Sequence, residues 1–290
     1  MDNLKKKLLL LKKISLFVIL SISILSMTSC GKNDEKYEKY DLEIDTLSVG
    51  KADAIIITIK DKTVLIDCGE EDDSKKIIDN LKAKKINHID LLMITHFDKD
   101  HVGGAKDVIN EFDIDKVMYP DYEGTNKEYE EFLSVLDKVK DVEVVSTDSE
   151  FTYEEADFSV YPVKDKSVLD PEKDDYDNEM SLVTRLNFGK KTFLFAGDIE
   201  KDRIGMMLDE GFDFKCDWLK FPHHGSYCKY LEDMLNKCDP EYVVMSVDKE
   251  EPVEDKAMEV IKKYDFKSFD TSVNDIITYS DGEEIEVVKK

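Results

Sequence analysis

The sequence predicts an α/β (α+β) protein in which two β-sheets pack together and helices lie outside them. The first observation is the mixed order of the elements: strands come first as hairpins, helices are then interleaved with strands, and the same succession begins again. The second is that residues 30–290 contain no Pro/Gly/Ser-rich linker and no internal repeat. This length suits one large domain or two small ones, and we expect the first half to end near Tyr153.

Each element is predicted from its apolar pattern. Segments that alternate or run apolar over four to eight residues indicate strands, and residues 72–84 indicate a helix because Ile77, Ile78 and Leu81 share one face. A turn at Asp61 and Lys62 indicates a hairpin. The predicted strands are residues 40–48, 54–60, 62–67, 89–94, 116–119, 142–145, 157–163, 181–188, 192–197, 218–221, 242–247, 276–279 and 284–288, and the predicted helices are residues 72–84, 102–112, 127–140, 201–210, 229–237 and 255–264.

The first 29 residues have the pattern of a targeting segment. Five lysines precede an apolar run over residues 14–27, which is short for a transmembrane helix, and small residues then precede Cys30. This ending resembles a bacterial lipobox, which predicts a lipoprotein signal peptide at residues 1–29 and lipidation of Cys30. Residues 30–40 would then be a membrane tether and residues 41–290 the folded domain, anchored to the cell membrane at its extracellular face. An ordinary secretory signal and an uncleaved anchor are the alternatives.

The formal net charge is −25, and because residues 1–29 contribute +4 (five lysines and Asp2), the rest of the chain carries −29. A surface of this sign repels nucleic acid and anionic lipid, which argues against a dedicated DNA-binding protein. A phosphate substrate stays compatible with it, because bound dications would dominate the local field. Nucleic acid is therefore expected only as a substrate, and no protein partner can be identified from the sequence.

Four cysteines follow Cys30. Export permits disulfides, and Cys216, Cys228 and Cys238 are close enough in sequence for one pair among them. Cys68 follows a predicted core strand and is expected to be a small buried thiol.

A dense group of polar side chains follows the predicted strand at residues 89–94. His96, Asp98, Asp100 and His101 are all side chains that bind zinc and related divalent ions. Residues i and i+2 of an extended segment point the same way, so His96 and Asp98 are expected to reach one point. Asp100 and His101 would face a second point from a loop that leads into a helix. A divalent-metal site and a charged surface loop both explain this segment taken alone.

Two later strands end in the same way. Asp198 follows the predicted strand at residues 192–197, where it would bridge two metals or cap the next helix. His223 and His224 follow the predicted strand at residues 218–221. Four of the five histidines thus stand at strand ends and only His88 does not, which favours a metal site over a charged loop.

With these motifs in order, the chain resembles the metallo-β-lactamase fold in its ComEC-like (competence-type) branch, as a free-standing lipoprotein. Asp98 stands where most members carry a histidine, as is typical of that branch. The resemblance runs from about Leu42 to Val288. The matching segments are Leu47 to Ala54, Leu65 to Gly69, His96-x-Asp98-x-Asp100-His101, Asn178-x-x-Ser181, Gly197-Asp198 and His223-His224-Gly225-Ser226.

The resemblance implies a four-layer αββα sandwich with two divalent metal ions, zinc or manganese, at one edge. His96, Asp98 and Asp198 would hold one ion. The other would be held by Asp100, His101, Asp198 and one residue of the His223–His224 pair. We expect His223 to be the ligand and His224 to be a catalytic or substrate-binding group. The other residues expected around the ions or the substrate are Asp67, Asn178, Ser181 and Ser226.

This site would make the chain a metal-dependent hydrolase. Two dications lower the pKa of a shared water, so hydroxide is available near neutral pH, and Asp100 would be the catalytic group that moves a proton. We expect a phosphoester substrate, as for a phosphodiesterase or nuclease-like enzyme. A teichoic-acid phosphorylcholine esterase and a non-catalytic binding lipoprotein with a vestigial site are the alternatives. The missing third histidine argues against β-lactam hydrolysis.

Overall fold

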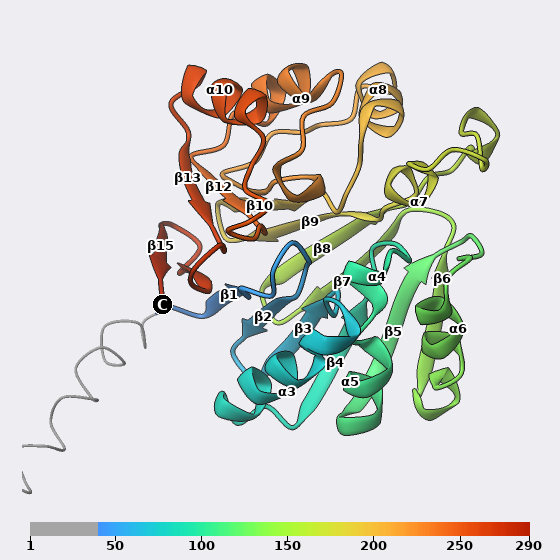
Figure 1. Cartoon of the computed structure of the whole chain (residues 1–290). Helices are drawn as coiled ribbons and strands as arrows, with labels where there is room; N and C mark the ends of the chain where they lie inside the picture. The colour runs from blue at the N-terminus through green and yellow to red at the C-terminus, as the bar shows by residue number, and fades with distance from the viewer. Residues whose placement is uncertain (1–39) are drawn as a thin grey trace, which may run out of the picture. The chain divides into compact units, whose positions relative to one another are not determined.

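The computed structural model describes residues 40–290. The expected signal peptide, Cys30 and nearly all of the expected tether lie outside the described residues. The described chain forms two β-sheets with helices on their outer faces (Figure 1). The strands are β1 Leu42–Thr46, β2 Ile55–Ile59, β3 Lys62–Ile66, β4 His88–Met93, β5 Asp113–Pro120, β6 Asp141–Val145, β7 Ser149–Tyr153, β8 Ala156–Tyr161, β9 Val183–Phe188, β10 Lys191–Phe195, β11 Trp218–Lys220, β12 Tyr242–Met245, β13 Lys267–Asp270, β14 Ile276–Ser280 and β15 Ile285–Lys289.

The helices connect and cover these strands. The α-helices are α3 Ser74–Ala83, α4 Lys99–Val102, α5 Ala105–Glu111, α6 Lys127–Leu133, α7 Tyr176–Glu179, α8 Lys201–Asp209, α9 Leu231–Cys238 and α10 Asp255–Lys263, and the 3₁₀ turns are η1 Glu71–Asp73, η2 Leu136–Lys138, η3 Lys166–Val168 and η4 His223–Gly225. Within the described residues, no helix is both long enough and apolar enough to cross a membrane.

The first sheet has the strand order β15-β14-β1-β2-β3-β4-β5-β6. Strands β1 to β3 pair antiparallel, as the alternating apolar residues and short turns predict, whereas β3, β4, β5 and β6 pair parallel. The second sheet has the order β13-β12-β11-β10-β9-β8-β7, with β10 to β13 parallel. In both sheets, the candidate ligands follow the carboxyl ends of parallel strands, so they gather at the same end of the strands.

Three apolar cores separate the four layers. The central core joins inward-facing residues of both sheets, among them Ile57, Leu91, Phe195 and Trp218. A second core lies between the first sheet and helices α3, α5 and α6, and a third lies between the second sheet and helices α8, α9 and α10. Strands buried on both faces explain the continuous apolar runs in the sequence. The four-layer αββα sandwich predicted from the sequence is confirmed.

The structure corrects several predicted elements. The chain does not divide simply near Tyr153, because β7 already belongs to the second sheet, and β14 and β15 return to the first. Strands β7 and β13 were not predicted, since half-exposed strands lack an apolar run. The predicted helix at residues 102–112 is shorter, α5 at Ala105–Glu111, and the short helix α4, which was not predicted, precedes it across Gly103 and Gly104. All four described cysteines are free thiols, so none of the possible disulfides forms.

Candidate metal centre

The predicted site residues gather where four strands end. Asp67 follows β3, the segment from Thr95 to His101 follows β4, Asp198 follows β10, and the His223–His224 pair follows β11. Strand β3 is parallel to β4, and β10 is parallel to β11, so each pair of strands brings its carboxyl ends to the same place. The two sheets therefore present these segments to each other.

Asp67 orients two histidines, His101 by direct contact and His96 through Thr95. Its carboxylate accepts hydrogen bonds from the Thr95 hydroxyl at 2.7 Å and from Nδ1 of His101 at 2.8 Å. The Thr95 hydroxyl donates its only proton to Asp67. Its oxygen also lies 3.0 Å from Nδ1 of His96, so the imidazole must be the donor in that contact. Both imidazoles therefore carry a proton on Nδ1, so Nε2 is the nitrogen of His96 and His101 that would bind a metal ion, after loss of any proton it holds.

A close approach of two backbones holds this segment in place. A side-chain carbon added to Gly104 would lie 2.3 Å from the carbonyl oxygen of Cys68, which no larger residue tolerates. The amide of Cys68 also donates to the carbonyl oxygen of His101 at 2.7 Å. The glycine pair after His101 thus lets the ligand segment pack directly on the end of β3, and it explains the break between α4 and α5.

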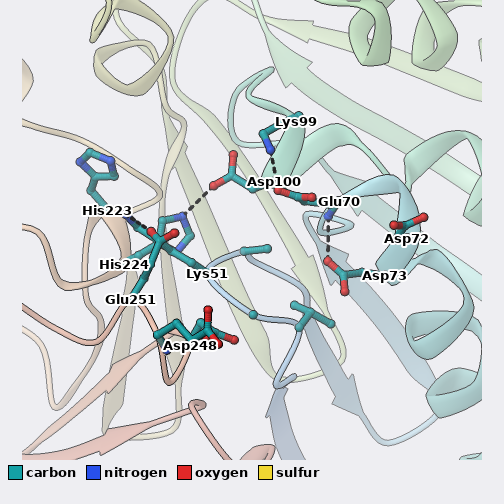
Figure 2. A pocket seen from close by; sticks show the side chains of 14 residues that line it. Lys51, Glu70, Asp72, Asp73, Lys99, Asp100, His223, His224, Asp248 and Glu251 are labelled. Atoms are coloured by element: carbon teal, nitrogen blue, oxygen red, sulfur yellow. Dashed lines mark hydrogen bonds and ion pairs between the residues drawn. The ribbon is translucent and has the colours of Figure 1, made fainter.

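The structure reverses the expected roles of the neighbouring histidines. We expected His223 to be the ligand, but the ring of His224 is the one that faces the cluster and is 99 % buried as a side chain. Nδ1 of His224 lies 3.1 Å from the carbonyl oxygen of Ser246, so Nε2 is left free. Nδ1 of His223 lies 3.1 Å from Oε1 of Glu200 at ion-pair distance, without hydrogen-bond geometry, and the ring points away from Asp100 (Figure 2).

The backbone causes this reversal. His223, His224 and Gly225 have φ values of 43°, 50° and 82°, so three consecutive residues occupy the left-handed region. This tight turn points the ring of His224 toward Asp100 and Asp198. Left-handed non-glycine residues cost free energy and persist where the surroundings hold them, which is common at functional sites.

Asp198 lies between the histidines. Its Oδ2 atom is 3.3 Å from Nε2 of His101 and 3.1 Å from Nε2 of His224, and Nε2 of His224 is 3.2 Å from Oδ2 of Asp100. Two sets of possible ligand atoms result, each within 4.8 Å: His96, His101 and Asp198 form one, and Asp100, His101 and His224 form the other. The sets share His101, so they are neighbours.

The charges of these groups are strongly coupled. Burial lowers the pKa of His224, but Asp198 and Asp100 outweigh burial and raise this pKa to about 9. Burial also opposes protonation of His101, yet Asp198 and Asp67 hold its pKa well above the ordinary value. Burial acts to raise the pKa of Asp198, and His224 and His101 nevertheless hold it well below its usual range. Without a metal, buried carboxylates are therefore balanced by protonated imidazoles, a charge that a divalent cation would replace.

Asp98 lies beside His96, and Asn178 contacts Glu200. Oδ2 of Asp98 is 3.7 Å from Nε2 of His96, and the Asp98 side chain is 38 % exposed. Asn178 is buried and donates from Nδ2 to Oε1 of Glu200 at 3.0 Å. Asp177, a residue that the sequence reasoning treated only as part of an acidic loop, hydrogen-bonds to Asp98, and burial together with the charge of Asp98 raises its pKa to about 6. This side of the centre is thus rich in oxygen donors.

The two predicted serines lie on the supporting segments. The hydroxyl oxygen of Ser181 accepts a hydrogen bond from the amide of Asp198 at 3.1 Å, which anchors the turn after β10. Ser226 contributes its backbone, because its amide donates to the carbonyl oxygen of His223 at 2.8 Å.

Unpaired buried atoms test whether these residues fit a metal ion. Nε2 of His96, Oδ1 of Asp198 and Oδ1 of Asn178 are buried and have no hydrogen-bond partner. A buried polar atom without a partner is costly and rare, and three of them at one edge need a common explanation. All three are lone-pair donors, so a cation satisfies them where another acceptor would not. The donor set of nitrogen and carboxylate oxygen fits divalent metal ions.

A cleft of about 490 Å³ opens beside this centre (Figure 2). Asp100, His223 and His224 line its inner end. Lys51 and Lys99 also line it, but each pairs with a carboxylate of the cleft, Glu251 at 3.2 Å and Glu70 at 2.8 Å. The remaining acidic residues of the lining are Asp72, Asp73, Asp248 and Glu250. The cleft is therefore negatively charged outside the metal centre.

Four supporting residues were not assigned a role from the sequence. Thr95 immediately precedes His96, and its position as the last residue before the ligands was the available signal. Asp177 carried no signal beyond its neighbour Asn178. Asp53 and Lys220 form a buried ion pair at 2.7 Å below His224, and only the tertiary structure brings them together.

Comparison with known proteins identifies the family to which this sequence belongs. Residues 47–247 match the model of the metallo-beta-lactamase superfamily. The chain is 24 % identical over 262 residues to ComE operon protein 3 of Bacillus subtilis (strain 168), which covers 82 % of this chain and 33 % of the relative. It is also 24 % identical over 210 residues to Recombination protein 2 of Haemophilus influenzae, which covers 70 % of this chain and 24 % of the relative. This chain thus spans a third or less of either curated relative.

Among solved structures, the metallo-beta-lactamase fold protein YhfI from Bacillus subtilis is similar with a TM-score of 0.53 and 14 % identity. The similarity covers 86 % of this chain and all of that one, and at this identity it shows the fold alone. The family match covers more than half of the chain, and the matched segment contains every candidate ligand at the strand ends. This chain belongs to the metallo-β-lactamase superfamily of hydrolases and is similar to its ComEC-like members.

Proposed function

We propose that this chain hydrolyses phosphoester bonds with the help of two divalent metal ions. The observation that carries the proposal is the convergence of lone-pair donors without partners, His96 Nε2 and Asp198 Oδ1, on a centre that opens into a cleft. One ion would be held by His96, Asp98 and Asp198, and the other by Asp100, His101, Asp198 and His224. Asp198 would serve both, since Oδ2 faces the histidines and Oδ1 is unpaired.

Two divalent ions in this position supply Lewis acidity, which polarises a phosphoryl oxygen and lowers the pKa of water. The chain itself supplies proton acceptors and donors. Asp100 lines the cleft as a carboxylate and is placed to accept a proton from the attacking water. His223 also lines the cleft, beside Glu200, and is placed to donate a proton to the leaving oxygen. The reaction then needs no nucleophile from the protein.

The metals are zinc or manganese. Asp98 supplies oxygen where many family members supply nitrogen, and Asn178 and Asp177 add oxygen atoms on the same side. Oxygen donors suit harder ions, so this composition supports manganese for the ion beside His96.

The substrate is proposed to be a small phosphoester. The names of the curated relatives, one of them a recombination protein, support a phosphodiester of nucleic acid. The acidic cleft opposes a long polyanion, because phosphates beyond the scissile one would meet Asp72, Asp248 and similar carboxylates. Nucleic acid is therefore proposed only as a substrate presented at a short or terminal segment.

The same acidity favours a second candidate, an esterase of the phosphorylcholine type. A positive charge next to the phosphate would be attracted by the cleft rather than repelled. Quaternary ammonium groups are usually bound by aromatic cages, and none of the described residues lining this cleft is Phe, Tyr or Trp. The cleft therefore supports this candidate through charge alone.

Metal analysis and hydrolysis of bis-p-nitrophenyl phosphate by the wild type and His101→Ala test the proposal. We expect two equivalents of metal and turnover for the wild type, with both reduced in the variant. A wild-type protein that binds no metal and hydrolyses nothing would support a vestigial site instead. Single-stranded DNA, p-nitrophenyl phosphorylcholine and nitrocefin, assayed in parallel, would rank the possible substrates.

We also propose a location at the extracellular face of the cell membrane, with lipid on Cys30. The sequence of residues 1–30 supports this, as described above. Metabolic labelling with a fatty acid tests it: wild-type protein should be labelled, and Cys30→Ala should not.

A further inference from the structure

We propose that the buried Asp53–Lys220 ion pair is a positioning device that holds His224 against the ligand segment of the other sheet. The inference rests on the proposed metal centre and concerns two residues outside its ligand sets. Nζ of Lys220 lies 2.7 Å from Oδ2 of Asp53, and both side chains are at least 98 % buried. A lysine so deeply buried requires a charged partner, and Asp53 is that partner.

The pair joins the two sheets directly below the centre. Asp53 precedes β2 of the first sheet, and Lys220 is the last residue of β11 in the second. Most contacts between the two sheets are apolar, and a few neutral hydrogen bonds also cross, such as the one from Trp218 Nε1 to Thr278 Oγ1 at 3.0 Å. Apolar contacts have no direction of their own. A charged hydrogen bond has a defined direction and length, so it fixes the register of the two sheets at this point.

The pair also contacts both ligand-bearing segments. The amide of Asp53 donates to the carbonyl oxygen of Asp100 at 3.1 Å. Nζ of Lys220 donates to the carbonyl oxygen of Phe221 at 3.2 Å, immediately before the turn that carries His224. One ion pair therefore connects the start of α4 to the entry of the left-handed turn.

The carboxylate of Asp53 reaches His224 itself. Its Oδ1 atom lies 3.9 Å from Nδ1 of His224 and has no hydrogen-bond partner, whereas Nδ1 is 3.1 Å from the carbonyl oxygen of Ser246. Two acceptors therefore face Nδ1–H of His224, so Nε2 is the ring nitrogen that would bind a metal ion. A negative charge behind a ligating imidazole also raises its basicity toward a metal.

The strained turn explains why such a device is needed. His223 and His224 both have positive φ, so a relaxed backbone at this position would turn the imidazole away from Asp198. The amide of His223 donates to the carbonyl oxygen of Gly197 at 3.2 Å, and Lys220 contacts the carbonyl oxygen of Phe221 just before the turn. The proposed role of the pair is thus exerted through His224.

A thermodynamic cycle on the full-length chain tests this role. Binding of Mn²⁺ would be measured by isothermal titration calorimetry for wild type, Asp53→Asn, His224→Ala and the double variant. We expect Asp53→Asn to weaken about 10–100-fold the ion that His224→Ala also weakens. In the His224→Ala background, Asp53→Asn should have no further effect on metal affinity, because the residue through which it acts is gone.

The Asp45–Lys84 pair supplies a matched control. It is also a contact of 2.7 Å between a fully buried aspartate and a lysine, but it links β1 to the end of α3. Asp45→Asn should leave metal affinity within about twofold of wild type, even where it lowers thermal stability. The visible spectrum of Co²⁺-loaded protein gives a second readout: it should change in Asp53→Asn and not in Asp45→Asn.

Asp53→Asn leaves Lys220 buried without a charged partner, so this variant is at risk of not folding. The double change Asp53→Asn and Lys220→Met removes both charges. If Asp53→Asn alone does not fold, this double change takes its place in the same cycle. A folded variant of either kind that binds both ions with wild-type affinity and spectrum would overturn the proposal. So would an effect of equal size in the presence and absence of His224. A wild type that binds no Mn²⁺, Co²⁺ or Zn²⁺ would instead refute the proposed function.

Discussion

Nε2 of His101 lies 3.2 Å from Nε2 of His224, although the two residues are 123 positions apart and follow strands of different sheets. Each ring uses Nδ1 for a separate acceptor, Asp67 for His101 and Ser246 O for His224. The nitrogen atoms that face each other are thus the ones available to a metal. Five properties of this centre can be measured.

The two neighbouring histidines should have different phenotypes. His224→Ala removes a buried donor, so we expect loss of about one equivalent of metal and at least about 100-fold lower hydrolysis. His223→Ala should keep the full metal content, because its ring lies outside the ligand sets, and should lower kcat about 100-fold through loss of a proton donor. Elemental analysis and steady-state kinetics measure both. The exposed change Glu150→Ala is the control, and equal metal loss in both histidine variants would refute the assignment.

Thr95 should matter through its hydroxyl group. Thr95→Val keeps the shape but leaves Nδ1 of His96 without its acceptor and Asp67 without a donor. We expect metal affinity to fall about 10–100-fold. Thr95→Ser retains the hydroxyl and should bind metal nearly as the wild type does. Calorimetry with Mn²⁺ separates the two, and identical affinities for Ser and Val would show that the hydroxyl has no part in orienting the ligands.

Metal binding should depend on pH. His224 has a pKa of about 9 in the metal-free protein against an ordinary value of 6.5, so it is protonated at pH 7, and metal must displace that proton. Apparent affinity should rise with pH up to about 9. Calorimetry in buffers of different ionisation enthalpy should detect about one to two protons released at pH 7, since His101 is protonated as well. Binding without proton release would contradict this.

The metal-free protein should lose stability over the same range. A pKa that is raised on folding stabilises the fold fully below the unfolded value of 6.5 and ceases to do so as pH rises through about 9. The melting temperature of protein stripped with a chelator should therefore fall by several degrees between pH 6.5 and 9. Thermal scans of the metal-loaded protein serve as the comparison, and they should show a smaller fall because the ion replaces the proton.

Asp98 should influence the choice of metal. Replacing it by histidine, the residue that most family members carry there, exchanges an oxygen donor for nitrogen beside His96. We expect Asp98→His to shift preference from manganese toward zinc by about tenfold or more. Competition between Mn²⁺ and Zn²⁺, read by elemental analysis, measures this ratio. The exposed change Asp141→His controls for adventitious zinc binding, and an unchanged ratio in Asp98→His would show that Asp98 contributes no ligand.

Much of the fold was predictable because its signals are local. Strands β4 and β10 are continuous apolar runs, and each is followed by polar residues that need partners when they are buried. Both the strands and the candidate ligands after them could therefore be predicted. Strand β13 was missed because its residues are exposed or half-exposed, so pairing with β12 is what makes it a strand. The return of β14 and β15 to the first sheet was equally invisible, because it is decided by long-range pairing.

The sequence by itself indicated two packed sheets and the residues from which the centre is built, because spacing along a strand and at its end is a local property. The family and the four-layer fold followed from the resemblance of its motifs to those of known proteins. Only the tertiary structure decided that His224 rather than His223 faces Asp198, since that choice depends on a left-handed turn fixed from outside the segment. It likewise decided that Asp53 and Lys220 meet. They are 167 residues apart, and only the packing of one sheet on the other places a buried charge opposite its partner.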